Sequence, residues 1–356
     1  MKNKSTNILY IYTARRSFVN NDIQLLEKHF KVTPYHFKTD NKKRTPLSFL
    51  RQLIYLLAVG WKYDSFVCFF AGYHSVLPSW FSKWTGKECI IFLGGTDCFN
   101  YPSFRYGNFT KRWYAWATCF SAHRASMLVP VSHNLIESSS GYYTVDSTTQ
   151  GIYHWCRPLD VPHKVIALEY NPSRFYPTSQ HRNTNNFISV AFGIEGSSFV
   201  RKGIDKMIMI ATQFPQYTFT IIGCEAKDFP VEIPSNVSVL PPVPYDELPA
   251  HYSRHEFYLQ LSIAEGFPSA ICEAMLCGCI PIGSDVAAIP EIIGNAGFIV
   301  RHRDDALILE TIQQAVSYAQ KESMALAARQ HIIDSFGEGK REKELFNLFR
   351  QTATPS

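Results

Sequence analysis

Several sequence features that mark other protein classes are missing. The nine cysteines contain no Cys-x-x-Cys pair, and only Cys277 and Cys279 lie close together. This pattern predicts reduced thiols in a cytosolic protein rather than a zinc site or a disulfide framework. The longest apolar run, LIYLLAVGW at 53–61, is about half as long as a membrane span, so no transmembrane helix is expected. The first apolar run is broken by Arg15 and Arg16, which indicates a strand and not a signal peptide.

Charge is scarce and unevenly distributed. Only 18% of residues are charged against 46% hydrophobic, which is typical of a folded soluble protein. Residues 1–164 contain 20 Lys and Arg against 9 Asp and Glu, a net charge of +11, and the remainder has 15 against 21, a net charge of −6. The basic half could face anionic lipid or phosphorylated molecules, or be only a solvated surface. No nucleic-acid motif accompanies it, so nucleic acid is not an expected partner.

Apolar strand-like runs alternate with helical patterns along the whole chain, which predicts parallel βαβ units. The runs are 7–12, 31–37, 64–70, 88–93 and 127–131, then 187–192, 217–223, 236–240, 256–262, 279–283 and 297–301. Helical patterns cover 203–214, 245–254, 268–277 and 304–335, and an amphipathic piece follows at 342–351.

The length of 356 residues exceeds one ordinary core. The polar, proline-containing segment 171–186 is the expected linker. We therefore predict an α/β fold of two Rossmann-like, doubly wound domains facing each other across a cleft, at 1–170 and 187–335. Residues 336–356 form a C-terminal helix and tail, and ligands are expected at the carboxyl ends of the strands.

Two glutamates stand in an unusual place in the stretch AEGFPSAICEAMLCG at 264–278. Pro268 suits the first turn of a short, apolar helix and Gly278 suits the residue after its end. Glu273, inside that buried helix, must be neutralised or accept hydrogen bonds. Its partners are either donors of the protein or two hydroxyls of a ligand such as ribose. Glu265 lies at the helix mouth, where unpaired N–H groups favour an anion such as a diphosphate, or it is only a cap.

The motif E-G-F-P-S-A-I-C-E, followed by A-M-L-C-G-C-I-P-I-G and I-P-E-I-I, resembles the signature of retaining glycosyltransferases of family 4, which have the GT-B architecture (glycosyl transferases group 1). The resemblance covers the second domain and includes the K-G at Lys202 and Gly203, L-P-P-V before the D-E-L helix, and N-P-S-R-F-Y-P near the domain crossing. It implies that the C-terminal helix crosses back to the first domain. The first domain is only weakly similar.

The resemblance implies roles for individual residues. Glu265 would contact the sugar of a nucleotide-sugar donor, and Glu273 would hold its ribose hydroxyls. Lys202, with Arg201, would neutralise the diphosphate. The remaining donor contacts would come from Gly266, Phe267 and Ser269 at the helix mouth and from the backbone near Val243. Because no Asp-x-Asp pair occurs, we expect metal-independent transfer with no cofactor.

The sequence departs from the family pattern at three places. No Arg precedes Arg201 in the K-G loop, so Arg201 is the expected substitute. Ala287 and Ala288 replace a glycine pair. In the first domain the family's donor-contacting histidine is absent from F-L-G-G-T-D, and Asp97 either replaces it as a catalytic group or caps a turn.

The favoured hypothesis is a retaining glycosyltransferase of cell-surface polysaccharide biosynthesis. Its acceptor would be a glycan or lipid-linked intermediate, and the enzyme would be cytoplasmic and peripheral on the inner face of the plasma membrane, facing anionic lipid. Arg15 and Arg16 either bind an anionic acceptor or belong to a solvated loop. The alternatives are a nucleotide-sugar epimerase and a non-catalytic nucleotide-sugar-binding protein. A nicotinamide dehydrogenase is disfavoured because no Gly-x-Gly-x-x-Gly follows a strand.

Overall fold

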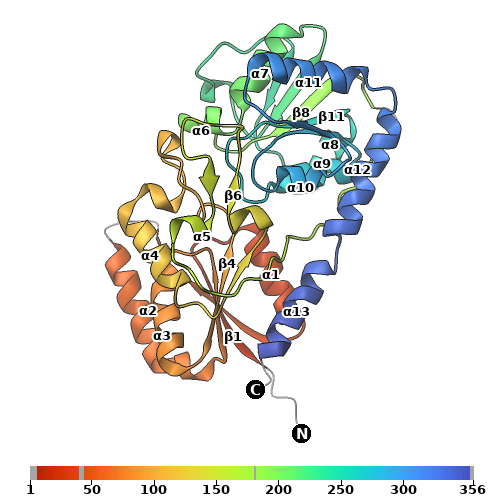
Figure 1. Ribbon diagram of the computed structural model, residues 1–356. Coiled ribbons are helices and arrows are strands. Elements are labelled where there is room, and N and C mark those ends of the chain that lie inside the picture. The colour runs from red at the N-terminus through yellow and green to blue at the C-terminus, as the bar shows by residue number, and fades with distance from the viewer. Residues whose placement is uncertain (1–5, 40–43, 180–181, 353–356) are drawn as a thin grey trace. The chain divides into compact units, whose positions relative to one another are not determined.

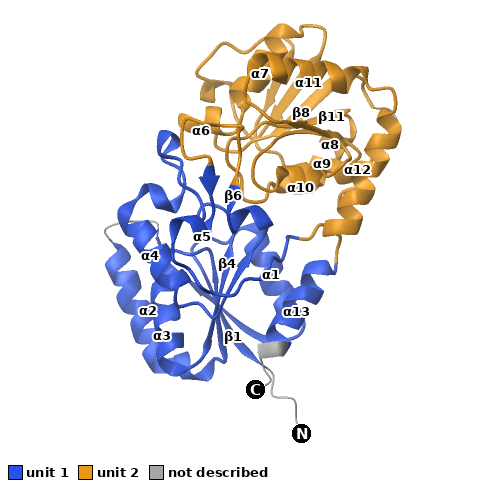
Figure 2. Ribbon diagram, in the orientation of Figure 1, with its two compact units in different colours: residues 1–138, 149–168, 339–356 blue, residues 139–148, 169–338 orange. Residues whose placement is uncertain are grey.

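The computed structural model describes residues 6–39, 44–179 and 182–352. The chain divides into two compact units (Figure 2). Unit 1 comprises residues 1–138, 149–168 and 339–356, and unit 2 comprises residues 139–148 and 169–338. The expected boundaries differ from these, because the short segment 139–148 and the expected linker 171–186 both join unit 2, whereas residues 339–356 belong to unit 1. Part of the expected linker, 180–181, and the tail 353–356 lie outside the described residues.

Unit 1 is built on a five-stranded parallel sheet in the order β2-β1-β3-β4-β5. The strands are β1 (Asn7–Tyr12), β2 (Lys31–His36), β3 (Ser65–Phe69), β4 (Glu88–Leu93) and β5 (Met127–Pro130), which confirms the five expected runs. The helices are α1 (Ser17–Glu27), α2 (Thr45–Val59), η2 (Gly60–Lys62), α3 (Tyr73–Thr85), α4 (Arg112–Ala122) and α5 (Ile152–Trp155). The chain order reverses between β1 and β3, as in a flavodoxin-like doubly wound sheet. Short 3-10 turns lie at Pro102–Phe104, Asn108–Thr110 and His133–Leu135, and the strands β6 (Ser138–Ser139) and β7 (Thr149–Gln150) form a separate pair.

Unit 2 contains a six-stranded parallel sheet in the order β10-β9-β8-β11-β12-β13. The strands are β8 (Asn186–Val190), β9 (Thr218–Ile222), β10 (Val237–Leu240), β11 (Phe257–Gln260), β12 (Ile280–Ser284) and β13 (Phe298–Val300). The helices are α6 (Ser197–Arg201), α7 (Ile204–Gln213), α8 (Leu248–Ser253), α9 (Ser269–Leu276), α10 (Ile289–Ile293), α11 (Asp305–Ser317) and α12 (Lys321–Phe336), with 3-10 turns at Ala226–Asp228 and Tyr245–Glu247. This is the strand order of a dinucleotide-binding Rossmann sheet, with its reversal between β8 and β11.

The apolar runs form strands because each central strand is covered on both faces. In β1, residues Ile8–Tyr12 are all buried, and in β4 the five residues after Glu88 are all buried. Both units are therefore parallel α/β sheets, as the alternation of patterns predicted.

The helical pattern at 304–335 forms two helices instead of one. Tyr318 adopts an extended backbone, with ψ at 125°, and its ring packs edge-on against Phe298 of β13 at 5.8 Å. No glycine or proline marks this break in the sequence, because it is set by a tertiary contact.

The last helix, α13 (Lys340–Thr352), belongs to unit 1 and lies beside α1 (Figure 1). Its Leu345, Leu348 and Phe349 are buried. Arg341, only 2% exposed, binds both carboxylate oxygens of Asp22 in α1 at 2.6 and 2.8 Å. The C-terminal helix therefore packs on the first unit, as expected.

The expectation that all cysteines are reduced is wrong for one pair. Cys119 of α4 and Cys156, just after α5, form a disulfide. The two cysteines are 37 positions apart in the sequence, and nothing in that spacing indicates that α5 returns to α4. The other seven cysteines are free and buried.

Candidate functional site

The candidate site in unit 2 lies where the strand order reverses. β8 and β11 are neighbours in the sheet although they are the first and fourth strands of the unit (Figure 1). The segment after β8 leads to Arg201 and Lys202, and the segment after β11 leads to Glu265. Because the loops on either side of a reversal turn to opposite faces of the sheet, a crevice opens between them. The structure thus brings three predicted site residues to one ligand-binding edge.

The two segments are joined by backbone contacts. Ile263 N–H donates to the Arg201 carbonyl at 2.7 Å, and the Arg201 side chain donates to the Ala264 carbonyl at 3.3 Å. Gly203 has a φ of +74°, and a Cβ placed there would lie 2.1 Å from the Leu261 carbonyl oxygen. The glycine of the K-G pair is therefore needed for this close approach. It fixes the Lys202 backbone against the strand end that carries Glu265.

Replacing Gly203 with alanine is expected to destabilise unit 2 by about 3 kcal/mol or more, because left-handed strain and steric overlap add. Gly86→Ala in unit 1 is the matched control, since Gly86 has the same left-handed backbone, with φ +68° and ψ 18°, but open space around the added Cβ. It should cost only the left-handed strain, about 1–2 kcal/mol. Urea unfolding followed by far-UV circular dichroism measures both. Equal losses would show that the contact with Leu261 is unimportant.

Lys202 and Glu265 are half-buried at this edge. Burial lowers the pKa of Lys202, and the nearby carboxylate of Glu265 acts in the opposite direction. The Lys202 ammonium donates to the Phe192 carbonyl. Glu265 accepts from the Ser262 hydroxyl at 3.1 Å, which leaves the other carboxylate oxygen with no hydrogen bond from the side chains described here. The pair places a cation and a hydrogen-bond acceptor beside each other.

The mouth of α9 follows Glu265 directly. Pro268 is the N-cap residue and provides no side-chain cap to the helix. Backbone N–H groups of the first turn, beginning at Ser269, have no partners within the helix. The Ser269 hydroxyl accepts from Tyr170 at 2.9 Å, and Phe267 stacks on the Tyr170 ring. Gly266 and Phe267 are buried in the turn that connects Glu265 to the helix mouth.

Glu273 is buried in α9 and only 5% exposed. It accepts hydrogen bonds from Tyr245 at 2.8 Å and from Tyr252 at 3.4 Å. Burial raises the pKa of Glu273 to about 7, and the two tyrosine hydroxyls act against that rise. Donors of the protein thus bind the Glu273 carboxyl in this structure, which agrees with one of the two interpretations of the sequence. Nothing in the sequence spacing marks Tyr245 and Tyr252 as partners, because they lie in the 3-10 turn η7 (Tyr245–Glu247) and in α8, more than twenty residues earlier.

Tyr245 is the accessible member of this group. It is 41% exposed, it stacks under the guanidinium of Arg174 at 4.3 Å, and it follows the half-buried Val243 by two residues. A ligand hydroxyl can therefore replace the Tyr245 hydroxyl on Glu273 by a movement of one partly exposed ring. Val243 lies in the loop between β10 and η7, at the same carboxyl edge of the sheet.

The raised pKa of Glu273 predicts a pH dependence of stability. Between its ordinary value of 4.5 and about 7, the folded protein binds a proton that the unfolded chain has released. Stability therefore falls as pH rises through this window, by up to about 3 kcal/mol. The Gln side chain of Glu273→Gln cannot ionise. The free energy of unfolding of this variant should therefore rise relative to that of the wild type as the pH increases from about 5 to about 8. Glu247→Gln, at an exposed position nearby, is the control. A constant difference across this range would contradict the buried, protonated carboxyl.

Asp97 occupies a structural position and not a catalytic one. It has no exposed surface, and its carboxylate accepts from the backbone N–H groups of Ala71, Gly94 and Gly95 at 2.9, 3.2 and 3.0 Å. Burial raises the pKa of Asp97 to about 6, against the opposing effect of these hydrogen bonds. The turn-cap alternative fits this geometry, and the expected replacement of a donor-contacting histidine does not.

A cavity of about 410 Å³ lies at the corresponding edge of unit 1. It sits at the carboxyl ends of β1 and β3, where the order of that sheet reverses. Its polar lining includes Arg16, His74 and Asn108, and its aromatic lining includes Phe18 and Tyr114. Arg16 thus faces a cavity as the acceptor-binding hypothesis requires. Arg15 is exposed and donates to Asn20 at 2.9 Å instead.

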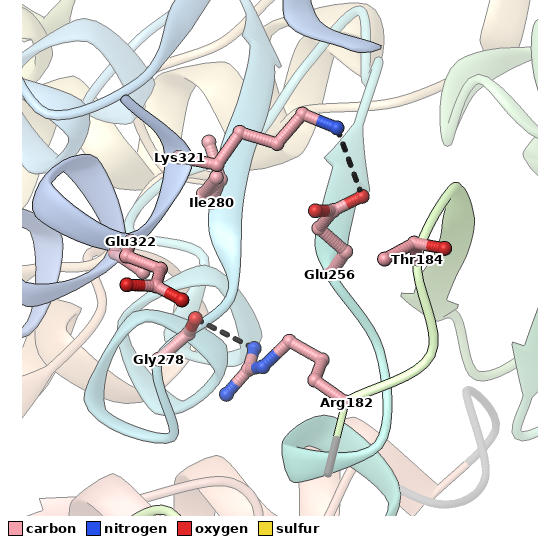
Figure 3. Close-up of a pocket in the computed structure, with 8 residues that line it drawn as sticks. Arg182, Thr184, Glu256, Gly278, Ile280, Lys321 and Glu322 are labelled. Carbon is pink, nitrogen blue, oxygen red and sulfur yellow. Dashed lines mark hydrogen bonds and ion pairs between the residues drawn. The ribbon is translucent and has the colours of Figure 1, made fainter. Parts of the chain in front are cut away.

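A second cavity, of about 380 Å³, lies in unit 2 at the amino-end edge of its sheet. Figure 3 shows residues that line it. Glu256 and Ile280 line it at the amino ends of β11 and β12. Arg182 donates to the carbonyls of Cys277 and Gly278 at the end of α9, and Lys321 pairs with Glu256 at 3.3 Å. The cavity is separate from the site at Glu265, because it lies at the amino ends of the strands and not at their carboxyl ends. Among the described residues, no cluster of His, Cys, Asp or Glu has the size needed to hold a metal ion.

Comparison with known sequences identifies the region that holds the unit 2 site. Residues 196–331 match the Glycosyl transferases group 1 family. The chain is 37% identical over 75 residues to O-antigen chain mannosyltransferase B of Escherichia coli. The aligned residues make up 20% of each protein. The chain spans between 20% and 42% of the length of five curated relatives that it matches.

Comparison with solved structures extends over the whole chain. The structure aligns with sucrose-phosphate synthase from Thermosynechococcus elongatus at a TM-score of 0.73 and 13% identity, over 97% of this chain and 98% of that one. It aligns with HepE of Anabaena, solved in complex with UDP and glucose, at a TM-score of 0.70 and 16% identity, over 97% and 100%. The chain therefore has the GT-B fold, and its region 196–331, with Lys202, Glu265 and Glu273, is similar to the Glycosyl transferases group 1 family.

Proposed function

We propose that the protein is a retaining, metal-independent glycosyltransferase that moves a sugar from a nucleotide-diphosphate donor to a glycan or lipid-linked acceptor in cell-surface polysaccharide biosynthesis. The observation that carries the proposal is the joining of the Lys202 and Glu265 segments at the strand reversal of unit 2, next to the mouth of α9. The likeness of this region to the Glycosyl transferases group 1 family supports the reaction class. The mannosyltransferase relative and the UDP complexes of HepE support the donor class.

The proposed chemistry assigns one task to each group. As the bond between sugar and diphosphate breaks, negative charge grows on the leaving group and the sugar becomes oxocarbenium-like. Lys202, Arg201 and the free N–H groups of α9 stabilise that growing charge. Glu265 accepts hydrogen bonds from the sugar and holds it in place. Glu273 accepts a hydrogen bond from a ribose hydroxyl, which displaces the Tyr245 hydroxyl from the carboxylate. The cavity with Arg16 receives the acceptor.

The test is a transfer assay in the presence and absence of a chelator. The full chain is incubated with a panel of nucleotide-diphosphate sugars, chosen first by thermal shift, and with glycan and lipid-linked acceptors. Release of nucleoside diphosphate together with a glycosylated product of retained anomeric configuration supports the proposal. An epimerised sugar from donor alone would point to an epimerase. Tight donor binding with no turnover would point to a binding protein. Loss of transfer on chelation would contradict the metal-independent mechanism.

A further inference from the structure

Helix α2 exposes a stripe of apolar residues. Its buried positions are Ser48, Gln52 and Leu56, and the side chains of Ser48 and Gln52 donate to the carbonyls of Lys38 and His74 at 2.8 and 2.9 Å. The exposed side carries Leu47, Leu50, Ile54 and Leu57, which are 45%, 53%, 58% and 46% exposed. A surface helix of a globular protein normally presents polar side chains on its exposed side. The outward stripe, at spacings of three and four residues, therefore suits a partner outside this unit.

Tryptophans extend this stripe over the neighbouring elements of unit 1. Five of the six tryptophans of the chain are exposed: Trp61, Trp80, Trp84, Trp113 and Trp116. Trp84 contacts both Trp61 and Trp80, with ring centroids 5.5 and 5.7 Å apart. These residues lie on η2, α3 and α4, and α3 packs against both α2 and α4 (Figure 1). We call Leu47, Leu50, Ile54, Leu57 and these five tryptophans the tryptophan face.

The charge around the tryptophan face has one sign. Segments 45–62, 73–85 and 112–122, which form the three helices and η2, contain no Asp or Glu. Exposed basic side chains lie among the apolar ones: Arg51, Lys62, Lys83, Lys111 and Arg112. Exposed tryptophan and leucine with interspersed Lys and Arg are the composition of helices that lie in a membrane interface.

We propose that the tryptophan face docks the protein on a bilayer that contains anionic phospholipid. The leucines and tryptophans enter the boundary between headgroups and acyl chains, and the Lys and Arg side chains contact lipid phosphates. None of the helices within 6–39, 44–179 and 182–352 is long and apolar enough to cross a membrane, so the docking is interfacial. A second copy of the chain fits this face less well, because an isologous dimer would place its basic side chains opposite one another. The inference does not depend on the proposed transfer reaction.

The test is co-sedimentation of the full chain with vesicles of phosphatidylcholine alone or mixed with phosphatidylglycerol. We expect binding to the mixed vesicles, with a blue shift of tryptophan emission. The triple variant Leu50→Ser, Ile54→Ser, Leu57→Ser should bind at least roughly tenfold more weakly, because each replacement removes apolar area from the interface. Leu326→Ser is the matched control, since Leu326 lies on α12 of unit 2 and is 71% exposed. It should bind as the wild type does.

A charge variant gives a second measure at exposed positions. Lys62→Gln, Lys83→Gln and Lys111→Gln together should remove the preference for anionic vesicles. Each lysine is expected to contribute roughly fivefold to the affinity for the anionic vesicles. The proposal is overturned if the wild type sediments with neither vesicle, or if both variants bind as tightly as the Leu326→Ser control. It is also overturned if the wild type forms a dimer in solution that the leucine variant abolishes, because the face would then join two copies of the chain.

Discussion

Replacing Lys202 with alanine is expected to lower kcat for sugar transfer by about 100- to 1,000-fold, the loss found when one charge-stabilising donor is removed from an active site. Lys202 is half-buried beside Glu265 and lies at the strand reversal of unit 2. In the proposed transfer, a cation at this position would act most strongly when the departing diphosphate gains negative charge. The variant should also bind a nucleoside diphosphate much more weakly, with affinity for the free nucleoside nearly unchanged. Steady-state kinetics and isothermal titration calorimetry measure the two effects.

Two controls make this prediction specific. Lys227→Ala removes a lysine of the same unit whose side chain is 74% exposed, and it should leave both kcat and nucleotide affinity unchanged. Because Lys202 also donates to the Phe192 carbonyl, the melting temperature of each variant is compared with that of the wild type. A Lys202→Ala protein that is folded and turns over at the wild-type rate would remove this lysine from the mechanism.

Replacing Arg341 with alanine is expected to lower the free energy of unfolding of unit 1 by about 3–5 kcal/mol, because it leaves Asp22 as a buried, uncompensated charge. Asp22 is 1% exposed, and its carboxylate also accepts from Tyr10 at 3.1 Å. Arg341 further donates to the carbonyls of Ile166 and Ala167 at 2.5 and 3.0 Å, so the substitution also deprives buried acceptors of their donor.

Tryptophan fluorescence measures this effect selectively, because all six tryptophans of the chain lie in unit 1. Lys340→Ala, an exposed change in the same helix, should alter stability by less than about 0.5 kcal/mol. The double variant Asp22→Asn, Arg341→Leu should recover part of the loss, since no charge is then left unpaired. Equal stability of Arg341→Ala and Lys340→Ala would show that this ion pair does not hold α13 on the unit.

Most of the secondary structure could be predicted from the sequence, because strand and helix patterns extend over only a few residues. Every expected strand exists within two residues of its predicted ends. Central strands such as β1 and β4 are short apolar runs because they are buried on both faces. The ends of α9 could also be predicted, because Pro268 and Gly278 determine them through their own backbone conformations. Gly278 has a φ of +83°. The K-G pair and the two glutamates could also be found from local spacing, although their roles rest on resemblance to a family.

Other features depend on where distant segments meet. The sequence could not show that Tyr245 and Tyr252 would satisfy Glu273, that Cys119 would pair with Cys156, or that Asp97 would be enclosed by three backbone N–H groups. Nor could it show that α2 would bury Ser48 and Gln52 and expose Leu47, Leu50 and Leu57, because both sides of that helix contain residues able to face a core.

The sequence by itself determined the two parallel α/β units, the order of their strands along the chain, and the short motifs that mark the site in unit 2. The tertiary structure decided which strands are neighbours, which buried carboxylates are held by the protein, and which apolar side chains remain exposed. The physical reason is that periodicity and helix caps act over a few residues. Burial, in contrast, is decided only when chain segments separated by tens or hundreds of residues pack together.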